Sequence, residues 1–125
     1  MNSKSVSIDE LIARVKAHPQ ISNAGMILCH NGIVRGWDRS GKDKVTGLNV
    51  RCHGEKIEEI RSWAEAQPGI VCVIIEALEG ELRVGDDLLY VVVAGDVRTN
   101  VVSAFTGIMD RVKSEGVSKI EHYDR

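Results

Sequence analysis

Residues 80–112 read GELRVGDDLLYVVVAGDVRTNVVSAFTGIMDRV, and they are the most informative part of the chain. This stretch begins with a polar, glycine-containing link and continues into the apolar run 88–94, which predicts a central strand. Asp96 is then placed to cap a final helix, and Gly116 is placed to end it. The broad apolar face of that helix comprises Val97, Val101, Ala104, Phe105, Ile108, Met109 and Val112. The stretch therefore predicts a buried strand followed by a helix with one buried face.

The sequence on the amino-terminal side of this stretch supplies further elements. Residues 7–10 have the S-x-x-E form of a capping box, which predicts a short helix that Pro19 stops. Residues 24–29 form an apolar run that Asn31-Gly32 closes, so we predict a strand followed by a turn. The segment 36–44 is polar and contains glycines, which is typical of an exposed loop.

The middle of the chain completes the pattern. From Leu48 to residue 53, apolar and polar residues alternate, which predicts a strand with one wet face. Residues 54–64 place apolar side chains at three- and four-residue intervals, which predicts an amphipathic helix. Residues 70–75 are β-branched nearly throughout and predict a second central strand. The order of these elements predicts an α+β fold, a two-layer sandwich of three main helices on a mixed or antiparallel sheet.

Length and composition fit a single domain spanning residues 1–125, because a chain of this length with 43% hydrophobic residues can bury one core. The net charge of −2 and the pI near 6.1 argue against nonspecific binding of nucleic acid. No apolar run reaches the roughly 18 residues of a membrane span, and the first residues lead into polar sequence rather than a signal-peptide core. We therefore expect a cytoplasmic protein with no membrane and no nucleic-acid partner.

Three cysteines and four histidines raise the question of a metal site or a thiol nucleophile. Cys29-His30 and Cys52-His53 offer both types of zinc ligand, but neighbours on a strand point to opposite faces and the short ligand spacing of a zinc knuckle is missing. Each cysteine, including Cys72, sits in an apolar predicted strand, where the thiol pKa rises and reactivity falls. We therefore expect reduced, buried thiols beside exposed imidazoles, with no metal and no cofactor.

Arg98, Lys113 and Lys119 are three cations placed along and just beyond the last helix of a slightly acidic chain. Lys113 lies at the margin of the apolar face, from which its ammonium can point into a groove. Arg98 and Lys113 are separated by about 22 Å along a continuous helix, which is too far for both to bind one small ligand. Two copies of the chain would have to meet for both residues to serve one site. The alternative is three unrelated surface cations.

The order and separations of several short motifs resemble those of the large, catalytic subunit of molybdopterin synthase, from about Gly25 onward. The motifs are Gly32-Ile33-Val34-Arg35, Gly80-Glu81-Leu82 followed by Gly85-Asp86, Val91-Val92-Val93, Arg98, Ala104-Phe105, Met109-Asp110, Lys113 and Lys119-Ile120-Glu121. The resemblance implies an α/β hammerhead fold and a homodimer of large subunits. It also implies a ubiquitin-like small subunit docked at each end, which makes a heterotetramer.

The same resemblance implies a reaction in molybdenum cofactor biosynthesis. The C-terminal Gly-Gly thiocarboxylate of the small subunit would supply sulfur to cyclic pyranopterin monophosphate, building the dithiolene of molybdopterin. Lys113 and Lys119 would be catalytic, through proton transfer or transient acylation. The substrate-binding residues would be Val34, Arg35, Arg98, Lys113, Lys119 and Glu121. Guanidinium donors suit a cyclic phosphate, and cations would stabilise the negative charge that develops in acyl sulfur transfer.

The chain departs from the family pattern at several positions. Val97 stands where the family usually has histidine, and Ala77-Leu78 replace His-Arg. Gly116-Val117-Ser118 replace a Pro-aromatic-Trp motif, and the sequence stops at Arg125 without the usual extension. Valine can neither donate a hydrogen bond nor shuttle a proton, so its presence could reduce or abolish sulfur transfer. The alternative functions are noncatalytic binding of a pterin or a ubiquitin-like partner, and a plain dimeric scaffold.

Overall fold

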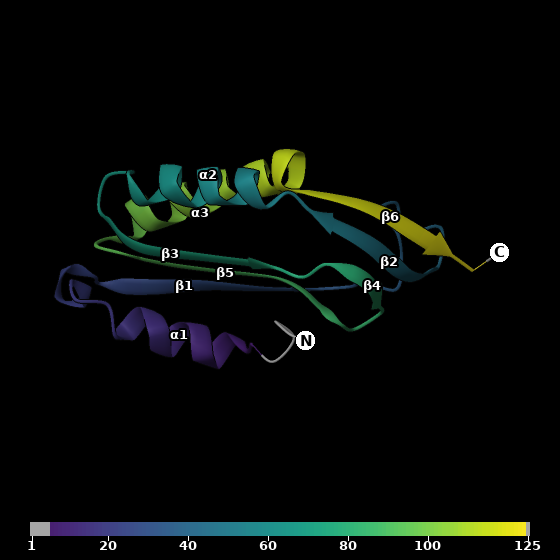
Figure 1. The fold of residues 1–125 in the computed structure, drawn as a ribbon, viewed down its shortest axis with the longest axis horizontal. Coiled ribbons are helices and arrows are strands. Elements are labelled where there is room, and N and C mark those ends of the chain that lie inside the picture. The colour runs from purple at the N-terminus through teal and green to yellow at the C-terminus, as the bar shows by residue number, and fades with distance from the viewer. Residues whose placement is uncertain (1–5, 125) are drawn as a thin grey trace.

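The computed structural model describes residues 6–124 and shows an α+β fold with three α-helices and six strands in that range (Figure 1). The elements are α1 (Ile8–Lys16), a short 3-10 helix (Ile21–Asn23), β1 (Met26–Ile33), β2 (Val45–Cys52), α2 (Gly54–Glu65), β3 (Ile70–Ala77), β4 (Gly80–Arg83), β5 (Asp87–Gly95), α3 (Arg98–Arg111), a π-helical turn (Val112–Gly116) and β6 (Val117–Tyr123). None of these helices is long and apolar enough to cross a membrane. The fold class and the three main helices are as the sequence predicts.

The larger of two antiparallel sheets has the strand order β1-β5-β3. Helices α2 and α3 cover one face of this sheet and α1 covers the other (Figure 1). The prediction of a central β5 is confirmed, and residues 91–94 are completely buried. The prediction that β3 is also central was wrong, because β3 lies at a sheet edge. Its β-branched residues reflect helices on both faces of the strand rather than strands along both of its edges.

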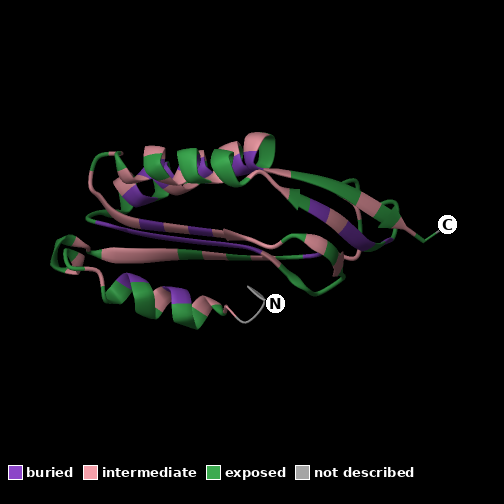
Figure 2. Cartoon of the chain, viewed as in Figure 1, coloured by how far each residue is buried: buried purple, intermediate pink, exposed green. Residues whose placement is uncertain are grey.

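Two clusters of apolar side chains hold the helices to the larger sheet. Figure 2 shows buried positions along the strands of this sheet and on the helices that pack against it. On the α2 and α3 side, the buried residues are Ile60, Ala64, Val73, Ile75, Leu89, Val91, Val93, Val101, Ile108 and Val112. On the α1 side, they are Leu11, Val15, Tyr90, Val92 and Ala94. The predicted capping box of α1 is confirmed, because the Glu10 N–H donates to Ser7 Oγ and the Ser7 N–H donates to Glu10 Oε1, each at 3.2 Å.

The long helix α3 matches its predicted apolar face over most of its length, and the π-helical turn that extends it ends at Gly116 as predicted. Two details at its start were wrong. Val97 is the N-cap residue and is 54% exposed, so it is not part of the buried face. Asp96 does not cap the helix, because its carboxylate accepts hydrogen bonds from the Val97 N–H and the Asn100 side chain instead of from the second or third helical N–H.

The smaller sheet has the order β4-β2-β6 and extends from one end of the larger one (Figure 1). Its own small core consists of Val34, Val45, Leu48 and Val50. Strand β2 was predicted, with its apolar residues buried as the alternation required. Strands β4 and β6 were not predicted, because β4 has only four residues and β6 carries mostly exposed side chains.

The predicted turn at Asn31-Gly32 is absent from the structure. Strand β1 continues to Ile33 and stays paired with β5, with a register shift between Gly32 and Ile33. The Asn31 side-chain amide donates to Asp87 Oδ1 at 3.1 Å and so ties this part of β1 to β5. Pairing along the whole strand outweighs the local turn preference of the Asn-Gly pair.

The predicted burial of the cysteines and histidines was partly wrong. Cys29 is exposed and His30 is half-buried, the reverse of the prediction, because His30 faces α3. Among the described residues of β1, the cluster beneath the sheet includes only Ile27, so Cys29 is left uncovered at the sheet edge. Cys52 and Cys72 are partly buried, and all three cysteines are free. Burial raises the pKa of each thiol, that of Cys52 to about 11, as the sequence predicted.

Candidate active site

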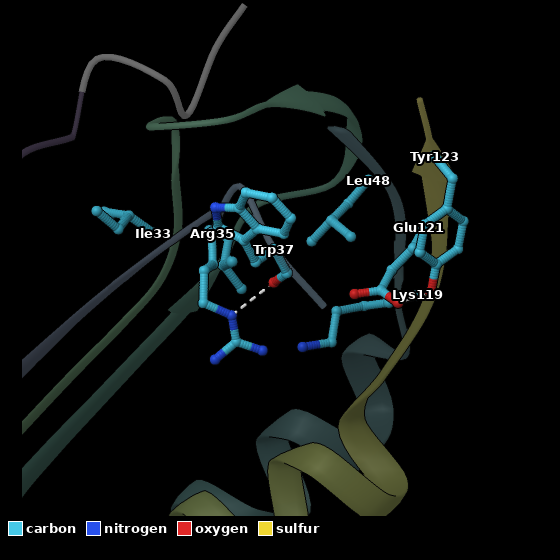
Figure 3. Close-up of a pocket in the computed structure, with 8 residues that line it drawn as sticks. Ile33, Arg35, Trp37, Leu48, Lys119, Glu121 and Tyr123 are labelled. Atoms are coloured by element: carbon cyan, nitrogen blue, oxygen red, sulfur yellow. Dashed lines mark hydrogen bonds between the residues drawn. The ribbon is translucent and has the colours of Figure 1, made fainter. Parts of the chain in front are cut away.

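Two adjoining cavities lie where the larger sheet, the end of α3 and the smaller sheet meet. The first has a volume of about 410 Å³ and is lined by Ile33, Arg35, Trp37, Leu48, Leu88, Lys119, Glu121 and Tyr123 (Figure 3). The second has a volume of about 300 Å³ and is lined by His30, Gly32, Leu88, Leu89, Met109, Asp110, Val112, Lys113, Val117 and Lys119. Because Leu88 and Lys119 belong to both walls, the two cavities adjoin at these side chains and together make up the candidate site.

Strand β6 places Lys119 at the junction of the two cavities. Lys119, Glu121 and Tyr123 alternate along β6 and therefore point to the same face of the smaller sheet. Lys119 pairs with Val50 of β2, and this register fixes the position of Lys119 along the sheet. The Tyr123 hydroxyl donates to Glu121 Oε1 at 2.6 Å, and this bond raises the pKa of Tyr123 to about 12. Glu121 is thereby oriented beside Lys119 on the cavity wall.

Arg35 reaches the first cavity from the segment that follows β1. Its Nε donates to the Trp37 carbonyl oxygen at 2.7 Å, which anchors the side chain and leaves the two terminal guanidinium nitrogens directed into the opening (Figure 3). The loop beyond is itself ordered by Asp38, whose carboxylate accepts hydrogen bonds from Ser40 Oγ and from backbone N–H groups. These bonds lower the pKa of Asp38. The loop therefore holds Trp37 and Arg35 in place.

Lys113 reaches the second cavity from the π-helical turn after α3. Buried Val112 anchors this turn to the main core, while Lys113 itself is exposed. A π turn shifts the direction in which the following side chains point, and such turns are frequent at functional sites. Lys113 and Lys119 thus approach the second cavity from two elements that meet at Gly116.

The cations of the site lack the carboxylate partners that some helical cations of the chain have. Lys56, Arg61 and Arg111 each pair with glutamates on their own helix or in the turn that follows it. Within residues 6–124, none of Arg35, Lys113 and Lys119 forms an ion pair. The cavity walls therefore carry three cations and two carboxylates, those of Glu121 and Asp110, which leaves a net surplus of one positive charge. Such a surplus of positive charge favours binding of an anion.

Two of the sequence-predicted site residues lie elsewhere. Val34 is only 1% exposed and packs in the small core, while its N–H and carbonyl bond to Asp86 and Gly85. Its side chain therefore faces away from the cavities and can only position its neighbour Arg35. Arg98 lies at the amino-terminal end of α3, opposite the end that carries Lys113, and lines neither cavity. Within one chain, the structure therefore brings together Arg35, Lys113, Lys119 and Glu121.

Sequence reasoning missed Trp37, Tyr123 and His30 as residues of the cavity walls. Trp37 had a usable signal, because a tryptophan in a polar loop has no predicted core to enter, and it is 51% exposed in the structure. Tyr123 gave no sequence signal, because β6 was not recognised as a strand. His30 gave none either, because the turn predicted after it obscured the direction of its side chain.

Comparison with curated proteins gives a related sequence. A probable molybdopterin synthase from Haloferax volcanii is 27% identical over 114 residues, which is 88% of this chain and 44% of the relative. The chain thus spans less than half the length of the curated relative it matches.

Two solved structures share the fold, and a family model matches the sequence. The molybdopterin biosynthesis MoaE protein from Burkholderia ambifaria superposes with a TM-score of 0.74 at 21% identity, over 94% of this chain and 82% of that one. A complex of subunits 1 and 2 of molybdopterin-converting factor from Helicobacter pylori gives 0.70 at 19% identity, over 93% and 78%. The model described as MoaE protein matches residues 1–115. The chain therefore belongs to the MoaE protein family.

Proposed function

We propose that this chain, as one domain over residues 1–125, is the catalytic subunit of a molybdopterin synthase. It would transfer sulfur from the C-terminal thiocarboxylate of a ubiquitin-like small subunit to cyclic pyranopterin monophosphate. The observation that carries the proposal is the convergence of Arg35, Lys113 and Lys119 on two adjoining cavities without carboxylate partners. Family membership and the name of the Haloferax volcanii relative support it.

The two cavities suit different parts of the reaction. Arg35 and Lys119 face the first cavity, which suits a cyclic phosphate because a guanidinium donates two hydrogen bonds to adjacent phosphate oxygens. Lys113 and Lys119 face the second cavity, whose other walls are largely apolar, as a narrow channel for a glycine tail requires. Lys119 would then contact both the anion and the acyl group, and its charge would stabilise the oxyanion formed during transfer. Glu121, which Tyr123 orients, lies beside Lys119 on the same wall and leaves its ammonium available to the substrate.

The small-subunit partner follows from the same argument. The Helicobacter pylori structure contains both subunits of a molybdopterin-converting factor, which supports an equivalent partner for this chain. Reconstitution with the thiocarboxylated small subunit of the same genome tests the function directly. Conversion of cyclic pyranopterin monophosphate to a dithiolene-bearing product is the expected result. Stable binding of partner and pterin without any product would instead favour the noncatalytic binding protein.

Arg98 lies at the far end of α3 from Lys113, so it could join the site only from a second copy of the chain. A site built from residues of two copies is called composite. We propose a homodimer in which Arg98 of one copy completes the cavity of the other. Mixing the Arg98→Ala and Lys113→Ala variants then tests the arrangement, because in a mixed dimer one site carries both substitutions and the other carries neither. With random exchange, activity should recover to about a quarter of the wild-type value. Each variant alone should stay near its own low level.

Two results would contradict the composite site. One is a strictly monomeric chain in sedimentation equilibrium at micromolar concentration. The other is a mixture of the two variants that gives only the average of their separate activities. A matched mixture of Arg98→Ala with wild type, in the same total amount, controls for dilution of the active copies.

A further inference from the structure

The second cavity contains a histidine for which the proposed function gives no role. His30 lies on β1 and points to the face of the sheet that α3 covers, so its half-buried imidazole lines the same cavity as Lys113 and Lys119. Within residues 6–124, neither imidazole nitrogen takes part in a hydrogen bond or an ion pair. The ring is therefore available to a molecule in the cavity.

Two neighbours hold the imidazole in this position. The Phe105 ring of α3 lies against it, with ring centroids 6.1 Å apart and planes tilted by 53°. On the other side, His30 Nε2 occupies space above Gly32, where a Cβ atom would lie only 2.8 Å from this nitrogen. The missing side chain of Gly32 thus provides the room into which the imidazole extends. Because Gly32 also lines the cavity, Nε2 lies at the cavity wall.

The surroundings of His30 favour its neutral form. Leu88 and Leu89 of β5 and Met109 of α3 are the apolar walls, and burial among them lowers the pKa of His30 below its ordinary value of 6.5. The charged groups of the cavity are Asp110 of α3, Lys113 of the π-helical turn and Lys119 of β6. At neutral pH the imidazole therefore carries a free lone pair in a cavity that also presents two ammonium groups.

We propose that His30 is the base that accepts a proton from water when the bond between the acyl carbon and sulfur is broken. The inference rests on the proposed function. Once the sulfur of the thiocarboxylate has bonded to a carbon of the pterin, a thioester joins the partner to the substrate, and water must cleave it. The water oxygen bonds to the acyl carbon, the carbon–sulfur bond breaks, and the electron pair stays on sulfur as a thiolate. One water proton moves to His30 Nε2, and the new carboxylic acid loses its own proton to solvent.

The test is a single-turnover assay of the full chain with its thiocarboxylated partner, at pH values from about 5 to 8. His30→Phe keeps an aromatic ring against Phe105 but removes the base, so product formation should slow by about 10²- to 10⁴-fold. The thioester of partner and pterin should accumulate and be visible by intact-mass spectrometry. In the wild type, the rate should rise with pH through the lowered pKa of His30, and this rise should disappear in the variant.

Two further variants separate a chemical role from a structural one. His18→Phe changes a half-buried histidine after α1, which packs on the opposite face of the larger sheet, and should leave both rate and pH profile unchanged. Gly32→Ala should push the imidazole out of its position and slow the reaction, with no further loss when combined with His30→Phe. If His30→Phe does not fold by circular dichroism, His30→Gln serves in its place.

The outcomes distinguish this inference from the proposed function. A wild type that forms product, together with a His30→Phe variant of equal rate and pH profile, overturns the role of His30 and leaves the synthase function standing. A slow variant that accumulates no thioester overturns the assigned step. A wild type that forms no product under any of these conditions overturns the synthase function, and the role of His30 with it.

Discussion

Replacement of Lys119 by alanine is expected to slow sulfur transfer by about 10²- to 10⁴-fold, because this ammonium lines both cavities and would act on the reacting acyl group. Single-turnover conversion of cyclic pyranopterin monophosphate, with enzyme and thiocarboxylated partner in excess, measures the effect. The loss should appear mainly in the rate at saturating substrate, since the interaction is strongest in the transition state.

The matched control for this variant is Lys42→Ala. Lys42 is an exposed lysine of the loop after β1 that lines neither cavity, so its removal changes the net charge equally and should leave the rate unchanged. A Lys119→Ala variant that keeps the wild-type rate, with an unchanged unfolding midpoint, would show that the chemistry takes place elsewhere.

Replacement of Arg35 by alanine is expected to weaken pterin binding by about 1.5 to 3 kcal/mol, which is roughly a 10- to 150-fold rise in the dissociation constant, because charge-assisted hydrogen bonds to the phosphate are lost. Isothermal titration of the chain with the substrate measures this change without requiring turnover. Arg35→Lys should recover only part of the affinity, since an ammonium cannot form the paired hydrogen bonds of a guanidinium.

Arg39→Ala provides the control for Arg35, because Arg39 is exposed in the same loop and lines neither cavity. The Arg35 variants also lose or alter the hydrogen bond to the Trp37 carbonyl, so tryptophan fluorescence should be recorded to follow the loop. Equal affinities of the wild type and Arg35→Ala for the substrate would show that Arg35 does not bind the phosphate in the first cavity.

The elements that the sequence predicted well are those whose apolar pattern is strong. Strand β5 and helix α3 carry uninterrupted or periodic apolar residues, and both lie in the main core. Strand β6 escaped prediction because its side chains are mostly exposed and its stability depends on pairing with β2, more than sixty residues earlier in the sequence. Long-range pairing of this kind leaves little trace in local composition.

Most residues of the candidate site could be named from the sequence, but their full geometry could not. The spacing of Arg98 and Lys113 correctly placed them at opposite ends of one helix, and the motif around Arg35 pointed to a segment that lines a cavity. Val34 belongs to that same motif, yet its side chain faces the small core because side chains alternate along an extended chain. The direction of His30 depended on how far β1 continues, and the Asn31-Gly32 pair gave a misleading local signal.

The division of the core has a consequence for how the protein responds to stress. Arg35 follows β1, and Lys119 and Glu121 lie on β6, so these groups depend on a sheet whose own core has only four buried side chains, whereas α1, α2 and α3 are held by the two larger clusters. We therefore expect the smaller sheet to open as a separate cooperative unit before the rest of the chain unfolds. Mild heat or denaturant would then abolish the anion site while helical circular dichroism remained native. Binding of the anion, in turn, would protect this sheet selectively against hydrogen exchange.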